Sequence, residues 1–246
     1  MKKTLFMFLI LLSAMLCACA NDVESSVPVI DMPSNTEITT VNPVTEYRIE
    51  NFECIYQSPE LPTGCEITAM DMVLNYYGFD IDKVTLANEY MPTISYDTYH
   101  NDENVTDKSD MNNYFIGDPE TVWGYIAGTG AIQIATNDYL ADVNSNKKAY
   151  DITGEPVSEL YKYVENDIPV VVWVTINMVD RTDIRYYYVD DDTYIEWTMD
   201  DHGAVLIGYD DTTVTLADPI NGIMEYDRTQ FESVFESREN MAVVVK

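Results

Sequence analysis

The pattern of apolar positions divides the chain into a helical part and a part dominated by strands. Up to about residue 166, apolar side chains recur every three or four positions, a spacing that places them on one face of a helix. This spacing predicts helices over residues 64–77, 82–90, 120–127, 131–142 and 157–166. Beyond that point, runs rich in Val, Ile and Tyr predict strands over residues 168–176, 185–197, 203–209, 213–217 and 242–245, with a short helix around Phe231.

Two other stretches have no apolar periodicity. Residues 20–45 are rich in Ser, Thr, Pro, Val and acidic side chains, which is typical of a flexible tether. Residues 92–118 form a long polar stretch, which we expect to be a functional lid or a mobile insertion. The remaining chain predicts one domain over residues 46–246, which begins with an extended segment at 47–56. Helices followed by antiparallel strands indicate an α+β fold, with N-terminal helices packed on an antiparallel β-sheet.

Composition and charge narrow the possible functions. The chain has 246 residues, of which 46% are hydrophobic, and this is enough to bury one sizeable core. It carries 43 acidic and 13 basic side chains, for a formal net charge of −30. A chain this acidic repels the phosphates of nucleic acids and of anionic membrane surfaces. Nucleic acid is therefore excluded as a partner. Separately, we expect the protein to be a monomer.

The N-terminus predicts export. Lys2 and Lys3 precede an apolar run of about a dozen residues, which is too short to span a bilayer and is typical of a signal peptide over residues 1–18. The sequence Leu-Cys-Ala-Cys that ends at Cys19 resembles a bacterial lipobox. We therefore expect a lipid on Cys19, tether residues 19–45, and a protein on the extracellular face of the cell membrane. Ordinary cleavage after Ala18, which would give a freely secreted protein, is the alternative.

The start of the first predicted helix carries a cysteine. Thr63 fits the N-cap position and Glu66, three residues later, fits the other half of a capping box. Cys65 lies in the first turn, away from the apolar face, which contains Ile67, Met70, Leu74 and Tyr77. Unsatisfied N–H groups at a helix start stabilise a thiolate and can also bind an oxyanion. Cys65 is therefore a candidate nucleophile, although an ordinary buried cysteine fits the same position.

A nucleophilic thiol needs a base and a group that orients the base. His202 stands directly before a predicted strand, and Asp218 ends the next strand. If the two strands form a hairpin, both side chains lie at the same edge of the sheet. The carboxylate would then hold the imidazole in one tautomer and favour the imidazolium. Gln57, at the end of the extended segment, is a candidate oxyanion donor.

Other uses of these residues remain open. A disulfide between Cys54 and Cys65 is an alternative that an exported protein permits. His100 lies in the polar stretch and is more typical of a solvated loop residue. The acidic residues near His202, which are Asp200, Asp201, Asp210 and Asp211, are expected to be solvated turn residues rather than calcium ligands. With so few histidines and thiols, a zinc site has little support, and we expect no cofactor or metal.

The segments around these residues together resemble a known family. They comprise Gln57 with residues 59–66, residues 72–78, 115–119 and 168–171, and then His202, residues 208–210 and Asp218-Pro219. In this order they are similar to the Peptidase_C39-like family, stand-alone relatives of the papain-like peptidases that cut bacteriocin leaders. The resemblance implies a papain-like fold, with Cys65 as nucleophile, His202 as base, Asp218 as orienting acid and Gln57 as oxyanion donor.

The resemblance implies a thiol peptidase that acts on a peptide or protein substrate outside the cell. Leader peptidases of this type are usually fused to an export transporter, whereas this sequence combines the motifs with an export signal. A double-glycine leader is therefore not the expected substrate. Two alternatives stay open, which are a peptidoglycan stem-peptide amidase with similar chemistry and a non-catalytic surface binding lipoprotein on the same scaffold.

Overall fold

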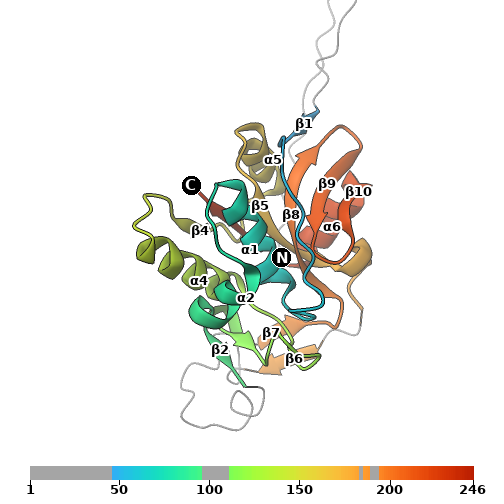
Figure 1. Ribbon diagram of the computed structural model, residues 1–246. Helices are drawn as coiled ribbons and strands as arrows, with labels where there is room; N and C mark the ends of the chain where they lie inside the picture. The colour runs from blue at the N-terminus through green and yellow to red at the C-terminus, as the bar shows by residue number, and fades with distance from the viewer. Residues whose placement is uncertain (1–45, 96–110, 183–184, 189–193) are drawn as a thin grey trace, which may run out of the picture. The chain divides into compact units, whose positions relative to one another are not determined.

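A long antiparallel sheet forms the centre of the computed structural model, which describes residues 46–95, 111–182, 185–188 and 194–246. The predicted signal peptide, Cys19, the tether and His100 lie outside these residues. Within the described residues, seven strands form the sheet in the order β10-β9-β8-β5-β11-β4, with β1 paired to β8 (Figure 1). The strands are β1 (Tyr47–Arg48), β4 (Ala149–Asp151), β5 (Val170–Thr175), β8 (Asp201–Tyr209), β9 (Thr213–Asp218), β10 (Gly222–Asp227) and β11 (Ala242–Val245).

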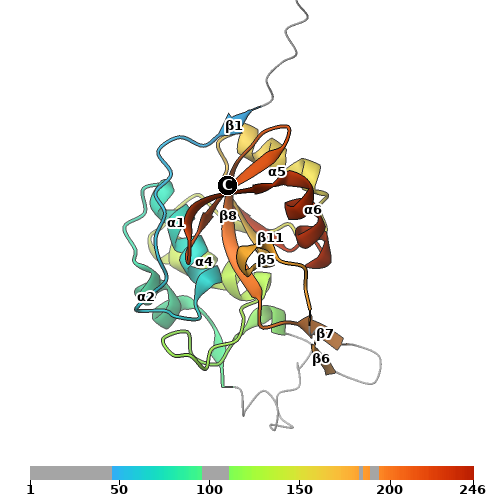
Figure 2. The same ribbon diagram turned by 90° about the vertical axis from the view of Figure 1, so that its right-hand side faces the viewer.

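The middle of this sheet is covered on both faces. Every residue of β5, β8 and β11 is buried, as expected when helices lie on both sides of a strand. Helix α1 (Cys65–Tyr76) packs against β8 and β5, and α4 (Thr129–Asp142) contacts α1, β4 and β11. Helix α6 (Arg228–Ser237) packs against β5, β9 and β10 on the other side of the sheet (Figure 2). Helix α5 (Val157–Glu165) packs against β8 and β1. The predicted α+β class, with helices packed on an antiparallel sheet, is confirmed.

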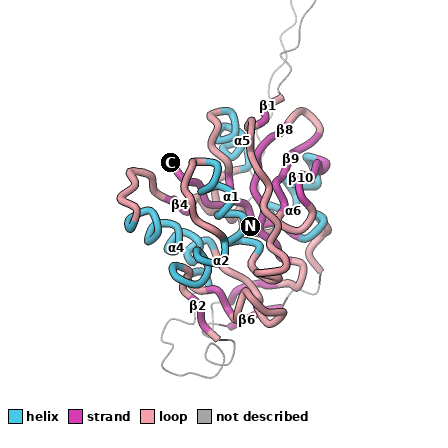
Figure 3. The backbone as a smooth tube through the Cα atoms, in the orientation of Figure 1, coloured by secondary structure: helices cyan, strands magenta, loops and turns pink. Residues whose placement is uncertain are grey.

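The chain reaches α1 through a segment that lies along the sheet. After β1, Ile49 donates its backbone N–H to the Ile207 carbonyl of β8 at 2.8 Å, and Gln57 donates to the Pro219 carbonyl at 2.9 Å. Residues 49–64 are drawn as loop between β1 and α1 in Figure 3. These bonds bring residues 57–64 close to the end of β9. A segment that connects sheet and helix in this way fixes where α1 begins.

The predicted helix over residues 120–127 is wrong. Residues 120–123 form turns and a bend instead, residues 124–126 are irregular, and Ala127 forms an isolated β-bridge with Phe115. The Asp118 side chain accepts the Glu120 N–H at 3.0 Å, and the Thr121 hydroxyl accepts the Trp123 N–H at 3.1 Å. Such side-chain bonds compete with the helical backbone pattern. The predicted helix over 82–90 exists in irregular form, as α2 (Lys83–Thr85) followed by a π-helical turn, η1 (Leu86–Tyr90).

The polar stretch at 92–118 is only partly a loop. It contains β2 (Thr93–Ile94), a 3-10 turn η2 (Met111–Asn113) and β3 (Phe115–Ile116), and β2 pairs in parallel with β3. Phe115 is completely buried, so this end of the stretch belongs to the core. The predicted strand over 185–197 is instead a separate hairpin of β6 (Arg185–Tyr188) and β7 (Tyr194–Trp197). Strands β4 and β10 were not predicted.

None of the helices that the structure describes combines the length and the hydrophobicity needed to span a bilayer.

Candidate active site

Helix α1 begins at Cys65 because the chain makes a tight turn immediately before it. Gly64 donates its N–H to the Leu61 carbonyl at 3.0 Å, and a Cβ on Gly64 would lie 2.9 Å from the Leu61 Cβ. Any larger residue would therefore push this turn open. Gly64 is the N-cap and supplies no side-chain acceptor. The first-turn N–H groups of α1 thus lack a capping side chain, which leaves positive partial charge beside Cys65.

The predicted capping box is wrong. The Thr63 hydroxyl does not cap α1 but donates to the Thr121 carbonyl at 2.9 Å, which ties the 118–124 loop to the residues just before the nucleophile. The Glu66 side chain is buried, and its Oε1 accepts the backbone N–H of Ala127 at 3.4 Å. The Thr63 hydroxyl and the Glu66 carboxylate, which the local pattern assigned to a cap, thus bind residues that are distant in sequence.

A close contact between α1 and β8 brings the candidate nucleophile and base together. A Cβ on Gly203 would lie 2.8 Å from the Glu66 Cα and 3.0 Å from its backbone nitrogen. Only glycine allows the strand to approach the helix backbone so closely. Cys65 directly precedes Glu66, and His202 directly precedes Gly203. The contact therefore places the two candidate residues at one junction.

His202 and Asp218 form a buried hydrogen-bonded pair. The imidazole Nε2 lies 2.9 Å from Asp218 Oδ1, and both side chains are almost completely buried. The predicted proximity of these residues is confirmed, and they lie at the same end of the paired strands β8 and β9. Burial acts to raise the pKa of Asp218, but the hydrogen bond and charge of His202 outweigh it, and the Ile220 and Asn221 groups add to this effect, so the pKa is lowered. Asp218 is thus a carboxylate acceptor.

The tautomer of His202 follows from this pair. A carboxylate can only accept, so Nε2 carries a proton, and in the neutral form of the imidazole Nδ1 keeps its lone pair. Nδ1 is buried and has no hydrogen-bond partner within the described part of the chain. A buried acceptor without a partner is costly, and such atoms are concentrated at functional sites. Nδ1 is therefore the atom available to take a proton.

The Cys65 sulfur is held as a thiol. Its residue is 8% exposed. Burial raises the pKa of the Cys65 thiol well above its usual value, and the neighbouring Glu66 charge raises it further. Hydrogen bonds from the backbone N–H groups of Gly203 and Glu66 act in the opposite direction but do not compensate. The backbone N–H groups therefore favour the thiolate, as the sequence indicated, but desolvation by burial outweighs them.

Gln57 lies between the segments that carry Cys65 and Asp218. Its backbone N–H donates to the Pro219 carbonyl, and its carbonyl accepts the Leu61 N–H, both at 2.9 Å. The buried side chain donates from Nε2 to the Pro62 carbonyl at 2.7 Å. An amide nitrogen has two hydrogens, so one N–H remains for another acceptor. The position fits a donor to an oxyanion formed near Cys65.

Comparison with known proteins identifies the scaffold. Residues 49–243 match the model of the Peptidase_C39-like family. The chain belongs to this family.

Two relatives agree with this assignment. The uncharacterized protein YvpB of Bacillus subtilis (strain 168) is 34% identical over 190 residues, which are 77% of this chain and 71% of YvpB. A crystal structure of a Bacillus anthracis protein assigned as a C39-like peptidase superposes with a TM-score of 0.71 at 29% identity. It covers 82% of this chain and 97% of that one. The helices and antiparallel sheet described above are therefore the papain-like scaffold of the Peptidase_C39-like family.

Asp201 contradicts the prediction of a solvated turn residue. Its carboxylate is buried and forms ion pairs with Arg181 at 3.1 Å and with Arg238 at 3.1 Å. It also accepts the Thr198 N–H at 2.9 Å. Burial without partners would be prohibitive for a carboxylate, and these contacts supply them. Because Asp201 directly precedes His202, the cluster fixes the start of β8.

Glu66 is a member of the site that sequence reasoning missed. It is 1% exposed, and its Oε2 has no hydrogen-bond partner among the described residues. Burial raises the pKa of Glu66, while hydrogen bonds from backbone N–H groups and from Cys65, together with the His202 charge, lower it. No local pattern reveals this role, because a glutamate after a helix-start cysteine also fits a cap.

The two cysteines of the body do not form the alternative disulfide. Both are free thiols. The Cys54 Sγ donates to the backbone carbonyl of Asp218 at 3.4 Å, and burial raises the pKa of this thiol to about 11. Among the described residues, no group of three His, Cys, Asp or Glu side chains is arranged to hold a metal ion.

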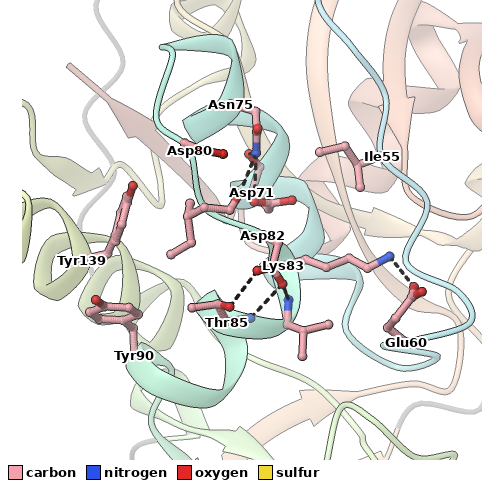
Figure 4. Close-up of a pocket in the computed structure, with 12 residues that line it drawn as sticks. Ile55, Glu60, Asp71, Asn75, Asp80, Asp82, Lys83, Thr85, Tyr90 and Tyr139 are labelled. Carbon is pink, nitrogen blue, oxygen red and sulfur yellow. Dashed lines mark hydrogen bonds and ion pairs between the residues drawn. The ribbon is translucent and has the colours of Figure 1, made fainter.

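A polar pocket of about 680 Å³ lies on the far part of α1 from Cys65. Figure 4 shows Asp71 and Asn75 of α1 on one wall, with Asp82 below them and Tyr139 opposite. Asp71 is 1% exposed, and burial followed by the Asp82 charge raises its pKa to about 7. The lining contains no nucleophile beside a base, so this pocket is not the candidate active site.

We expect Glu66→Gln to lower the pKa of the Cys65 thiol. The substitution removes a buried negative charge beside the sulfur while it retains side-chain size. The rate of Cys65 alkylation by iodoacetamide, followed by mass spectrometry across pH, should then rise at lower pH than in the wild type. Glu60→Gln is the matched control, because Glu60 is exposed and pairs with Lys83. A midpoint that is unchanged or higher in Glu66→Gln contradicts the expectation.

We expect Asp71→Asn to stabilise the protein more at pH 8 than at pH 5. The folded-state pKa of Asp71, about 7, lies above its ordinary value of 3.8, so the folded protein binds this proton more tightly. Its stability contribution is present below about pH 4 and is lost as pH rises through 7. At about 1.4 kcal/mol per pKa unit, the gain of the variant should grow by roughly 2–3 kcal/mol between these pH values.

Urea unfolding of both proteins at pH 5 and pH 8 measures this difference. Asp210→Asn is the control, because hydrogen bonds from the backbone N–H groups of Thr212 and Thr213 lower the pKa of Asp210 to about 2. That carboxylate is ionised in the folded and unfolded states throughout this range, so its substitution should have the same effect at both pH values. Equal effects of Asp71→Asn at pH 5 and pH 8 would show that Asp71 is not held protonated.

Proposed function

We propose that this chain is a thiol peptidase that hydrolyses peptide amide bonds through Cys65, His202, Asp218 and Gln57. The observation that carries this proposal is the buried His202–Asp218 pair, 2.9 Å apart, which leaves Nδ1 unpartnered beside the start of α1. Membership of the Peptidase_C39-like family supports the same chemistry on this scaffold. A structural pair would have no reason to leave a buried lone pair unused.

The reaction begins with a proton transfer. Because burial keeps Cys65 protonated, His202 Nδ1 takes the Sγ proton as the substrate carbonyl approaches. The sulfur electron pair forms a bond to the carbonyl carbon, and the carbonyl π electrons move to its oxygen. That oxyanion accepts hydrogen bonds from the Cys65 N–H and the free N–H of Gln57 Nε2. Asp218 stabilises the imidazolium that forms on His202.

The two products then leave in separate stages. The carbon–nitrogen bond breaks, and the leaving amine takes the proton from His202 Nδ1, which leaves a thioester on Cys65. Water next gives a proton to His202 and attacks the thioester carbon. The carbon–sulfur bond breaks, the acid product leaves, and the proton returns to the sulfur. The reaction consumes one water and needs no cofactor.

We also propose that the enzyme is exported and anchored to the extracellular face of the membrane through lipid on Cys19. The support is the basic start, the short apolar run and the lipobox-like sequence that ends at Cys19. Membership of the Peptidase_C39-like family supports a peptide or protein substrate, and the acidic composition argues against nucleic acid as a partner.

We expect Cys65→Ala to abolish both labelling by a thiol-reactive peptide probe and cleavage of a peptide library. Asp218→Asn should lower kcat by about 10²-fold or more, because the imidazole loses the partner that fixes its tautomer. Probe labelling on gels and mass spectrometry of the library measure the two activities. Cys54→Ala is the matched control and should still be labelled. Equal labelling and cleavage by Cys65→Ala and the wild type would contradict the proposal.

We expect Cys19→Ala to release the protein from the detergent phase of a Triton X-114 partition, because the lipid-bearing residue is gone. Cys17→Ala should remain in the detergent phase. Retention of Cys19→Ala in that phase would show that the lipid is attached elsewhere or that the signal peptide itself is the anchor.

A further inference from the structure

The apolar side chains that are most exposed gather around the candidate active site. Among the residues whose side-chain exposure the structure describes, the four most exposed large apolar side chains are Val122 at 74%, Trp123 at 72%, Met199 at 66% and Tyr56 at 55%. The next is Val143 at 45%. We call these four residues the apolar rim. Single exposed apolar residues are normal on a protein surface, whereas a group beside a reactive site indicates a binding surface.

Val122 and Trp123 are fixed beside the nucleophile. Thr63 lies two residues before Cys65. Its hydroxyl donates to the Thr121 carbonyl at 2.9 Å and so binds the loop that carries Val122 and Trp123. A Cβ on Gly124 would lie 2.0 Å from the Thr63 Oγ1, so the loop backbone presses directly on this residue. The exposure of Trp123 therefore belongs to a loop that is packed against the start of α1.

Gly117 holds the other end of the same loop. It has a φ of +100°, and a Cβ there would lie 2.2 Å from the Trp123 carbonyl oxygen. The backbone around Trp123 is thus closed on both sides by contacts that only glycine allows. The indole stays largely in solvent even though its backbone is firmly placed.

Met199 is fixed beside the base. It lies in the turn between Thr198 and Asp201, where the Thr198 N–H donates to the Asp201 carboxylate at 2.9 Å. Asp201 is in turn held by Arg181 and Arg238. The backbone N–H of Ile176 donates to the Asp200 carbonyl at 2.8 Å. Met199 therefore projects from an anchored turn at the start of β8.

Tyr56 is fixed beside the candidate oxyanion donor. It directly precedes Gln57, whose backbone is bound on both sides, and its own carbonyl accepts a hydrogen bond from the Lys83 ammonium. A Cβ on Gly222 would lie 2.8 Å from the Tyr56 hydroxyl oxygen, so the ring lies against the turn after Asp218. The apolar rim thus has two members beside the nucleophile, one beside the base and one beside the candidate oxyanion donor.

From this arrangement we infer that the enzyme takes extended peptides with large apolar side chains close to the scissile bond. This inference rests on the proposed peptidase function and names its substrate class. An extended peptide directs alternate side chains to opposite sides. A peptide that presents a carbonyl to Cys65 would therefore offer successive side chains to different members of the apolar rim. The net charge of −30 repels acidic peptides, so the favoured peptides are neutral or basic.

Peptide binding to the full chain carrying Cys65→Ala tests this inference without the need for catalysis. Two fluorescent peptides of equal length and charge are compared by anisotropy, one with Leu and Phe at its centre and one with Ser and Asn there. We expect the apolar peptide to bind at least about tenfold more tightly, which corresponds to burying one large side chain. Adding Trp123→Ser or Met199→Ser should remove most of that difference.

Val143→Ser is the matched control. Val143 is also an exposed apolar residue, but it follows the last residue of α4, and the 14-residue helix carries it about 20 Å from the end near Ala127. It should leave both affinities unchanged. Equal binding of the two peptides to the Cys65→Ala protein overturns the inference. So does a preference that Val143→Ser reduces as much as Trp123→Ser does.

Other outcomes separate the two proposals. Cleavage of both peptides by the wild type at equal rates would leave the peptidase standing and overturn the substrate class. Selective binding of the apolar peptide without any cleavage would keep the preference for apolar peptides, overturn the peptidase function and favour a surface binding protein. Trp123-dependent binding to phosphatidylcholine vesicles, with no peptide preference, would assign the apolar rim to a membrane surface and overturn the inference.

Discussion

The close approach of β8 to the first turn of α1 is the contact on which the candidate site depends. It exists because residue 203 is glycine, since a Cβ there would fall 2.8 Å from the Glu66 Cα. Interiors pack too tightly to absorb such an overlap without moving backbone. The contact fixes the relative position of a helix and a strand that are far apart in sequence. Cys65 and His202 are each one residue from it and are therefore positioned by the same constraint.

Electrostatics at this junction give two ionisable groups opposite states. The Cys65 thiol and the Asp218 carboxyl are both buried, and burial alone would keep both neutral. Asp218 overcomes this cost because it accepts hydrogen bonds from His202, from the Ile220 and Asn221 backbone and from the Asn221 side chain. For Cys65, the backbone N–H groups of Gly203 and Glu66 lower the pKa less than burial and the Glu66 charge raise it, so the sulfur keeps its proton. A charged orienting acid and a neutral nucleophile suit a histidine base that acts only during the reaction.

The distribution of polarity around the site reverses the usual arrangement. The four candidate catalytic side chains are each less than a tenth exposed, whereas Trp123 and Met199 are mostly in solvent. Buried polar groups need partners or a function, and exposed large apolar groups need a cover or a function. Both requirements are met if a substrate covers the apolar side chains while it reacts with the polar ones. The acidic charge of the whole chain then influences which peptides approach.

The sequence by itself determined the α+β class, the helix that begins at Cys65 and the pairing of His202 with Asp218. These depend on local periodicity and on a short hairpin, where neighbours in sequence are neighbours in space. It also indicated the family, because motif order is a property of sequence. It failed where side chains found distant partners. Glu66 and Thr63 look like a cap but bind the backbone of the 118–127 segment, and Asp201 looks like a turn residue but is buried between two arginines. Only the tertiary structure decided these, because desolvation and close backbone contacts arise from elements that the chain brings together after folding.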